Sequence, residues 1–257
     1  MKLRPSVLMY HGFADGVREY DPFAMFVSAD ALEAQLTFLL RSGRRPLDLD
    51  AYIATRQRPR RPSRSFLITI DDGFESVADI AAPILRRFGV PAVLFVPPAK
   101  IGGHSDWMTE LPDEPILTAE RLRDLRASGV ELGVHGLDHR DLVGLDDREL
   151  RRQTVEARDL MADMTGIRPR SFAYPRGAHD ERARAAVRGA GFDVAFTVFG
   201  GRGDHAVPRI DIAAVDTMRT VRMKMVPGYR SIWRAAGHAP TARRLARRLV
   251  TRSAGSS

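Results

Sequence analysis

The chain of 257 residues contains no cysteine. Disulfide frameworks, thiolate zinc sites and cysteine nucleophiles are therefore excluded, and any metal ion would have to be held by histidine and carboxylate side chains. Long apolar runs are missing too, because none approaches the ~20 residues that a membrane-spanning helix needs. The first ten residues lack the apolar core and the small-residue cleavage site of a secretory signal, so the expected location is the cytoplasm.

Acidic residues are absent from residues 217–257, which carry ten lysines and arginines. The preceding 216 residues hold the other 30 basic side chains and all 32 acidic ones, so the net charge of +8 belongs to the final segment. A protein that binds nucleic acid usually spreads basic residues over its working face, and nucleic acid is therefore not an expected partner. With 44% hydrophobic and 28% charged residues, the chain has the balance of a folded globular protein.

Short apolar runs alternate with helical patterns along the chain. Each run is rich in β-branched residues or phenylalanine and is bounded by glycine, proline or charge, which predicts buried strands. This alternation favours an α/β fold, a single distorted (β/α) barrel of about seven parallel strands. A doubly wound sheet would need a glycine-rich phosphate turn after an early strand, and none is present. The predicted strands are residues 7–10, 66–70, 92–96, 130–134, 172–174, 194–198 and 207–212, and the predicted domains are a barrel, 1–228, and a basic helical tail, 229–257.

The ends of two helices can be read from the sequence. Asp146, followed three residues later by Glu149, predicts the start of a helix. Its apolar stripe repeats with a 3.6-residue period over residues 150–164, as in a regular α-helix. A second helix is predicted to begin at Asp180 and to end at Gly191.

Polar side chains follow several of the predicted strands. His11 follows the first strand, Asp71 and Asp72 follow the second, and His135 follows the fourth, with His139 four residues later. In a parallel barrel the loops after the strands form one rim, and active sites lie there. Three of the chain's seven histidines are therefore expected to meet a pair of carboxylates on one rim.

The types of these residues favour a metal site. His135 and His139 lie on one face if the turn between them is helical, and with a carboxylate they match the ligands of an open catalytic metal site. The structural alternatives are a pair of surface histidines and, for Asp71 and Asp72, a turn that caps the next helix.

These residues stand in motifs that resemble those of the polysaccharide deacetylases, carbohydrate esterase family 4. The motifs are Thr-Ile-Asp-Asp-Gly at 69–73, His-x-x-x-His at 135–139 and Phe-Ala-Tyr-Pro-x-Gly at 172–177. Shorter similarities extend from Met9-Tyr10-His11 to Pro208-Arg209-Ile210, in the family's order and over most of the chain. The branch that looks most similar contains the poly-N-acetylglucosamine deacetylases.

The resemblance implies that Asp71 is the general base and that Asp72, His135 and His139 hold a divalent metal ion. Zn²⁺ is the first choice, with Co²⁺, Ni²⁺ and Mn²⁺ as alternatives. Such an ion polarises an acetamide carbonyl and lowers the pKa of a water molecule toward ~7.

Four residues are predicted to bind the substrate. The resemblance places the backbone N–H of Arg176, after Tyr174 and Pro175, where it can hold an oxyanion. Trp107, in the loop after the third strand, is interpreted either as a platform for a sugar ring or as a cover for the barrel end.

The general acid has no counterpart in the family's pattern, because Leu-x-x-His is absent and residues 207–210 read Val-Pro-Arg-Ile near its place. His11 is the predicted acid because of its place on the rim. His205, in a glycine-rich loop, is the second candidate. Where many family members have an arginine that braces the base, this chain has Ala173.

The predicted activity is metal-dependent removal of an N-acetyl group from an N-acetylamino sugar in a glycan or glycolipid precursor. One alternative is a deformylase or another amide hydrolase of the same superfamily. The other is a catalytically impaired, carbohydrate-binding relative. Asp71 argues against the latter, since metal binding alone does not require it.

The basic C-terminal tail has two interpretations. Residues 241–252 predict a helix with leucines on one face and arginines on its flanks. The helix could pack on the barrel, or it could contact anionic lipid at the inner face of a membrane. In the second case the substrate would be a polymeric or lipid-linked sugar at that surface.

Overall fold

All seven predicted strand segments form strands of one parallel sheet in the computed structural model, which describes residues 5–57, 64–108, 110, 113–198 and 200–226. Neighbouring strands run parallel throughout, as expected when helical segments connect them. The strands are β1 (Ser6–Tyr10), β4 (Arg45–Pro46), β5 (Ser65–Ile70), β6 (Ala92–Val96), β7 (Val130–Val134), β8 (Ser171–Ala173), β9 (Val194–Thr197), β10 (Val207–Pro208) and β11 (Ile210–Asp211).

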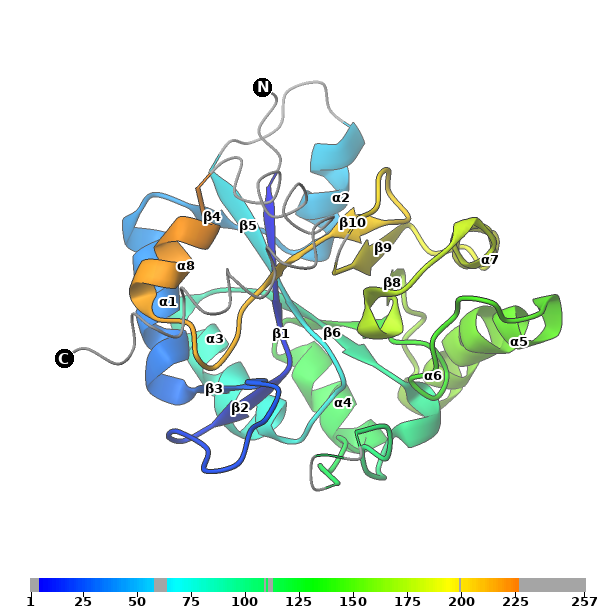
Figure 1. The fold of residues 1–257 in the computed structure, drawn as a ribbon, viewed down its shortest axis with the longest axis horizontal. Coiled ribbons are helices and arrows are strands. Elements are labelled where there is room, and N and C mark those ends of the chain that lie inside the picture. Colours follow the sequence, from blue (N-terminus) through cyan, green and yellow to red (C-terminus); the bar gives the residue numbers. More distant parts are fainter. Residues whose placement is uncertain (1–4, 58–63, 109, 111–112, 199, 227–257) are drawn as a thin grey trace, which may run out of the picture.

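The two edges of the sheet are joined by its last segment. The strand order is β10-β9-β8-β7-β6-β5-β1-β11, with β4 beside β5. β10 pairs with β9 and β11 pairs with β1, yet only Arg209 separates β10 from β11. One extended segment therefore bridges both edges and curls the sheet into a barrel (Figure 1). The predicted single barrel of about seven parallel strands is confirmed, and the path contains eight because Arg209 divides the last one.

The inside of the barrel is filled with apolar side chains. Because strand residues alternate between two faces, Leu67, Thr69 and Asp71 point the same way. Leu67 belongs to an inner cluster with residues of β1, β6, β8, β9 and β10, and α2 (Leu49–Gln57) contributes Leu49 and Tyr52 to it. Thr69, near the end of β5, and Asp71, directly after the strand, follow Leu67 on this inward face, where the chain leaves the apolar interior.

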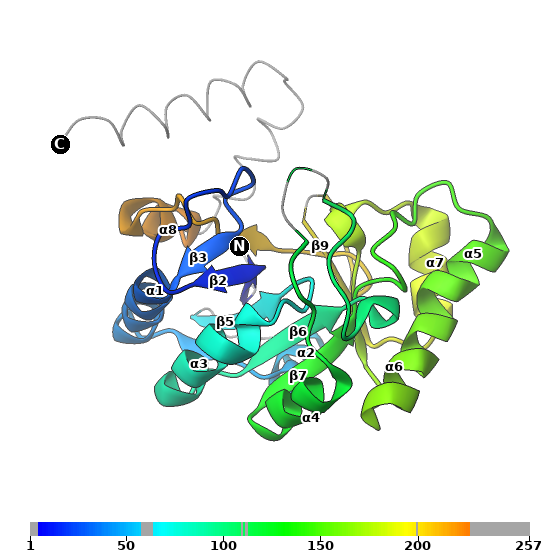
Figure 2. The same cartoon turned by 90° about the horizontal axis from the view of Figure 1, so that it is seen from below.

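Helices cover the outer face of the sheet. In Figures 1 and 2, α1 and α8 lie at one end of the molecule and α5, α6 and α7 at the other. Their apolar stripes pack on a second, larger cluster between sheet and helices. The elements are α1 (Ala29–Arg41), α3 (Ala82–Phe88), α4 (Ala119–Ala127), α5 (Asp147–Arg151), α6 (Ala157–Thr165), α7 (Glu181–Gly189), α8 (Met218–Lys224), the π-helical turns η1 (Val77–Ala81) and η3 (Arg152–Glu156), the 3₁₀ turns η2 (Pro98–Lys100) and η4 (Pro175–Gly177), and a small parallel pair, β2 (Gly12–Ala14) and β3 (Phe26–Ser28).

The helix predicted over residues 150–164 is not uniform. It begins as predicted, with the Asp146 carboxylate accepting a hydrogen bond from the Glu149 backbone at 2.8 Å. A π-helical turn, η3, then separates α5 from α6, so the prediction of one regular α-helix is wrong at this turn. The wider turn buries Gln153 beside Thr154, whereas the 3.6-residue period had included only Thr154. Gln153 is drawn inward by hydrogen bonds to the loop after β7.

The predicted tail, residues 229–257, lies outside the described residues. None of the helices that the structure describes combines the length and apolar character required to cross a membrane.

Candidate metal and catalytic site

Two adjacent carboxylates lie where β5 ends. The backbone N–H of Asp71 donates to the Tyr10 carbonyl at 2.9 Å, which extends the β1–β5 ladder by one residue. The chain then turns through left-handed conformations at Asp72 (φ 74°) and Gly73 (φ 78°). A Cβ at Gly73 would lie 2.9 Å from the Val96 side chain, so the turn requires glycine. Both carboxylates are buried, at 2% exposure each.

Asp71 is paired with a buried arginine. The guanidinium of Arg209 donates to both carboxylate oxygens of Asp71, each at 2.6 Å, and also to the Thr69 hydroxyl at 3.3 Å. Burial by itself raises the pKa of Asp71, but the charge of Arg209, helped by His135, outweighs burial and lowers this pKa. Asp71 is therefore an oriented, ionised carboxylate.

His135 is fixed as a neutral imidazole. Its Nδ1 lies 2.9 Å from the Ala173 carbonyl oxygen, which can only accept, so Nδ1 carries the proton. Burial lowers the pKa of His135 to about 4, although the charges of Asp71 and Asp72 oppose that shift. Its Nε2 therefore directs a lone pair toward Asp72 Oδ1, 3.6 Å away.

His139 reaches the same carboxylate from a non-helical turn. Its backbone is left-handed (φ 65°), as is that of Gly136 (φ 71°), so the turn between the two histidines is not the helical one that would place them on one face. The non-helical turn still brings the two imidazoles together, with ring centroids 4.9 Å apart. His139 Nε2 lies 3.3 Å from Asp72 Oδ1, and Trp107 stacks on the His139 ring at 4.3 Å.

Asp72, His135 and His139 fit a divalent cation. One donor atom from each lies within 4.8 Å of the others. Asp72 Oδ1 is buried without a hydrogen-bond partner among the described residues, although two imidazole nitrogens face it. Burial alone would raise the pKa of Asp72, but His139, with His11 and His135, lowers it. A buried carboxylate oxygen faced by two imidazole nitrogens is a donor set for a metal ion.

His11 lies beside the carboxylates. It follows β1, and since Tyr10 pairs with Ile70, His11 and Asp71 are the next residues on adjacent strands. His11 is half-buried, and its charge contributes to the lowered pKa values of both Asp71 and Asp72. The second candidate acid, His205, instead pairs its Nε2 with the Phe192 carbonyl oxygen at 2.8 Å.

The other predicted substrate residues lie at and around η4. The Tyr174 ring is buried, and its hydroxyl donates to the His205 carbonyl at 2.9 Å. Pro175 is buried, whereas Arg176 adopts a left-handed conformation (φ 53°). The Arg176 guanidinium reaches the Asp141 carboxylate at 3.2 Å and the Trp107 carbonyl at 3.4 Å. Arg176 therefore links the loop after β6 to the loop after β7.

Sequence reasoning missed Arg209 as the partner of Asp71. The signal was present, because an arginine flanked by apolar residues in a predicted buried strand needs a counter-charge. Arg209 braces Asp71, as the arginine found in many family members at the position of Ala173 would do. Gln153 was missed as well, because it lay just beside the predicted apolar stripe.

Comparison with known proteins points to one family. Residues 58–195 match the family described as polysaccharide deacetylase. Among curated relatives, the Bacillus subtilis (strain 168) protein YxkH, which carries a polysaccharide deacetylase name, is 24% identical over 213 residues, covering 80% of this chain and 71% of YxkH. Poly-beta-1,6-N-acetyl-D-glucosamine N-deacetylase of Staphylococcus aureus (strain MRSA252) is 22% identical over 201 residues, covering 73% of this chain and 68% of that enzyme.

Solved structures share the fold. IcaB from Ammonifex degensii superposes with a TM-score of 0.71 at 23% identity, covering 86% of this chain and 97% of IcaB. The Streptococcus pyogenes deacetylase PplD, solved in complex with acetate, gives a TM-score of 0.74 at 17% identity, covering 88% of this chain and all of PplD.

Proposed function

Since the chain belongs to the polysaccharide deacetylase family, we propose that it is a metal-dependent N-deacetylase acting on an N-acetylamino sugar in a glycan or glycolipid precursor. The observation that carries the proposal is the pairing of two unlike carboxylates at one strand end. Asp71 is held by Arg209, while Asp72 faces two imidazoles with an unpartnered oxygen in the described part of the site. A metal-binding protein without hydrolytic activity would need only the second arrangement.

The cofactor in this proposal is a divalent ion held by Asp72, His135 and His139. Two imidazoles and one carboxylate suit Zn²⁺, with Co²⁺, Ni²⁺ and Mn²⁺ as alternatives. When bound, such an ion polarises the acetamide carbonyl and acidifies water.

In the proposed reaction Asp71 is the general base and His11 the general acid. Asp71 accepts a proton from water as the water oxygen bonds to the amide carbon. His11 then gives a proton to the sugar nitrogen as the carbon–nitrogen bond breaks, so the products are acetate and a free amine. Arg209 keeps Asp71 ionised and fixes both of its oxygens. The backbone N–H of Arg176 is proposed to donate to the carbonyl oxygen as charge develops on it.

Three further side chains complete the proposed substrate site. Trp107 would present its free edge or face to the sugar while it stacks on His139. Pro175 and the buried Tyr174 support the η4 turn that carries Arg176.

Product analysis tests this function. The purified chain, with and without added Zn²⁺ or Co²⁺, is incubated with N-acetylated amino sugars, chitooligosaccharides and lipid-linked precursors, and released acetate and formate are measured. Metal-dependent acetate release that Asp71→Asn abolishes is expected. Formate from N-formylated analogues would favour the deformylase alternative, and sugar binding without release of either acid would favour an impaired carbohydrate-binding relative.

The predicted basic tail, residues 229–257, supports a proposal about location, namely a cytoplasmic chain in peripheral contact with anionic lipid. The full-length chain should sediment with anionic vesicles at low salt and be released at high salt. A chain that ends near Gly228 should stay in the supernatant while it keeps its activity on soluble sugars. Indifference of the full-length chain to such vesicles would contradict this contact.

A further inference from the structure

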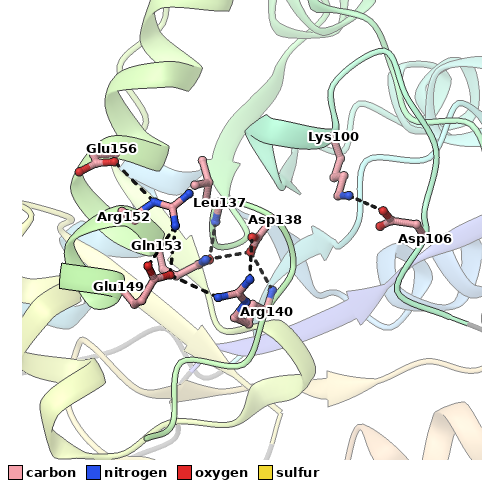
Figure 3. Close-up of polar contacts among 9 residues, drawn as sticks. All are labelled: Lys100, Asp106, Leu137, Asp138, Arg140, Glu149, Arg152, Gln153 and Glu156. Atoms are coloured by element: carbon pink, nitrogen blue, oxygen red, sulfur yellow. Dashed lines mark hydrogen bonds and ion pairs between the residues drawn. The ribbon is translucent and has the colours of Figure 1, made fainter. Parts of the chain in front are cut away.

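The buried side chain of Gln153 makes two hydrogen bonds to the turn between His135 and His139, and Figure 3 shows both. Gln153 Oε1 accepts from the Leu137 backbone N–H at 2.8 Å, and its Nε2 donates to Asp138 Oδ1 at 2.8 Å. One amide therefore fixes two consecutive residues in the middle of the His-x-x-x-His turn.

This turn needs such support. A left-handed conformation at a residue such as His139 is unfavourable and persists only when its surroundings hold it. Histidines that ligate metals usually donate their second ring N–H to a partner, which orients the ring. His135 has this bond, to Ala173, but His139 Nδ1 is buried without a hydrogen-bond partner among the described residues. The direction of the His139 ring therefore depends on its backbone and on the Trp107 stack.

The fold presents Gln153 to the turn through the π-helical turn η3. π-helical turns insert a residue into a helix and are frequent at functional sites. Gln153 is fully buried, so both ends of its amide need partners, and the turn supplies them. A Cβ at Gly136 would lie 3.0 Å from Gln153 Oε1, which shows how closely the amide approaches the turn.

Asp138 is also held from its outer side. Its second carboxylate oxygen lies 3.8 Å from Arg140, which in turn meets Glu149 at 3.3 Å (Figure 3). The Gln153 N–H therefore donates to Asp138 Oδ1, while Arg140 lies on the side of the other carboxylate oxygen.

We propose that Gln153 is a positioning residue for the metal site: by fixing Leu137 and Asp138 it directs His139 toward Asp72. The inference rests on the proposed function, because it assumes that Asp72, His135 and His139 hold a cation.

The decisive variant is Gln153→Glu, which keeps the shape and the acceptor for Leu137 but turns a carboxylate toward Asp138. We expect the affinity for Zn²⁺, measured by competition with a chromophoric chelator, to fall about 10- to 100-fold. The absorption spectrum of the Co²⁺-loaded protein should change as well. In the double variant Gln153→Glu/Asp138→Asn the asparagine can donate to the new carboxylate, so most of the affinity should return.

The matched control is Gln35→Glu. Gln35 is an equally buried glutamine whose Oε1 accepts from the Tyr10 hydroxyl at 2.9 Å, in α1. Its replacement should leave Zn²⁺ affinity unchanged, and thermal unfolding of the metal-free variants measures any general loss of stability. Wild-type affinity in Gln153→Glu would overturn the inference. So would a loss that Gln35→Glu shares, or one that Asp138→Asn does not recover. If the wild-type chain itself binds no Zn²⁺, Co²⁺, Ni²⁺ or Mn²⁺, the metal-dependent function fails first and this inference fails with it.

Discussion

Asp71 and Asp72 are neighbours in the chain and equally buried, but they belong to two different halves of the site. On the base side, Arg209 engages both oxygens of Asp71. On the metal side, Asp72 Oδ1 faces the imidazole nitrogens of His135 and His139 at 3.6 and 3.3 Å. The comparison teaches that the partner, and not the residue type, decides the role of each carboxylate.

The cause of the lowered pKa also differs between the two sides. Burial opposes ionisation of both carboxylates, but the fixed charge of Arg209 outweighs burial for Asp71, whereas for Asp72 neighbouring imidazoles do so. A guanidinium is always charged, so the base side is complete in the protein alone. The metal side presents a neutral imidazole at His135, and in the proposed function a divalent cation supplies the positive charge there.

The largest effect is expected from breaking the metal side. His135→Ala/His139→Ala leaves one carboxylate, which should not retain the expected one equivalent of divalent metal per chain. Deacetylation should fall about 10³-fold or more, because a catalytic cation supplies several kcal/mol of charge stabilisation. Elemental analysis and acetate release measure the two effects. Full metal content in this variant would contradict the assignment of the ligands.

The second largest effect is expected from replacing Arg209, the partner of Asp71 on the base side. Arg209→Met leaves the Asp71 carboxylate buried without its counter-charge, so the free energy of unfolding should fall by about 3–5 kcal/mol. The pKa of Asp71 should rise, because burial then acts without Arg209, and the acidic limb of the pH–rate profile should move to higher pH. Arg209→Lys keeps the charge but loses the bidentate hydrogen bond. Its free energy of unfolding and its acidic limb should therefore lie between those of the wild type and of Arg209→Met. If the acidic limb of the pH–rate profile is unchanged in Arg209→Met, Arg209 does not control the pKa of Asp71.

Replacing Asp71 should affect activity but not metal binding, which distinguishes the base side of the site from its metal side. Asp71→Asn should lower activity by a factor of ~10² or more, as for a lost general base. Metal content should stay at the wild-type level, because the metal side is untouched. Turnover at the wild-type rate would reduce Asp71 to a structural residue.

The metal side should also make the metal-free protein sensitive to acid. Burial lowers the pKa of His135 to about 4 in the folded state, while an unfolded chain titrates its histidines near ~6.5. Between these values the unfolded state binds more protons, so stability falls as the pH drops from 6.5 toward 4. Denaturant titrations with chelator present should give a free energy of unfolding about 2 kcal/mol lower at pH 5 than at pH 7. His135→Asn should flatten this dependence; the same slope in both proteins would assign it to other groups.

The smallest effect is expected at Trp107, whose ring stacks on His139 of the metal side. Aromatic pairs contribute about 0.5–1.5 kcal/mol, so Trp107→Ala should weaken Zn²⁺ binding by a factor of roughly 2–10, with Trp107→Phe closer to wild type. Zn²⁺ affinity and KM for the sugar, measured separately, distinguish support of His139 from sugar binding. If Trp107→Ala raises KM but leaves the affinity for Zn²⁺ unchanged, Trp107 contributes to sugar binding and does not support His139.

The sequence by itself determined the barrel and most of the rim. Short β-branched runs between helical patterns predict parallel strands, and the C-terminal ends of parallel strands meet at one rim whatever the details of packing. This rule placed Asp71, Asp72 and His135 on one rim, and the structure brings them together with His139.

Only the tertiary structure decided how these residues are held. Arg209 lies 138 positions from Asp71 and reaches it because the last segment closes the barrel between β9 and β1. The turn from His135 to His139 is not helical, with left-handed conformations at Gly136 and His139, and Gln153 meets it through a π-helical turn that a 3.6-residue period cannot show. Periodicity records which face of an element is apolar. The partner of a buried polar atom is settled only when elements distant in sequence pack together, because such an atom takes whichever donor or acceptor the closed fold brings within hydrogen-bonding distance.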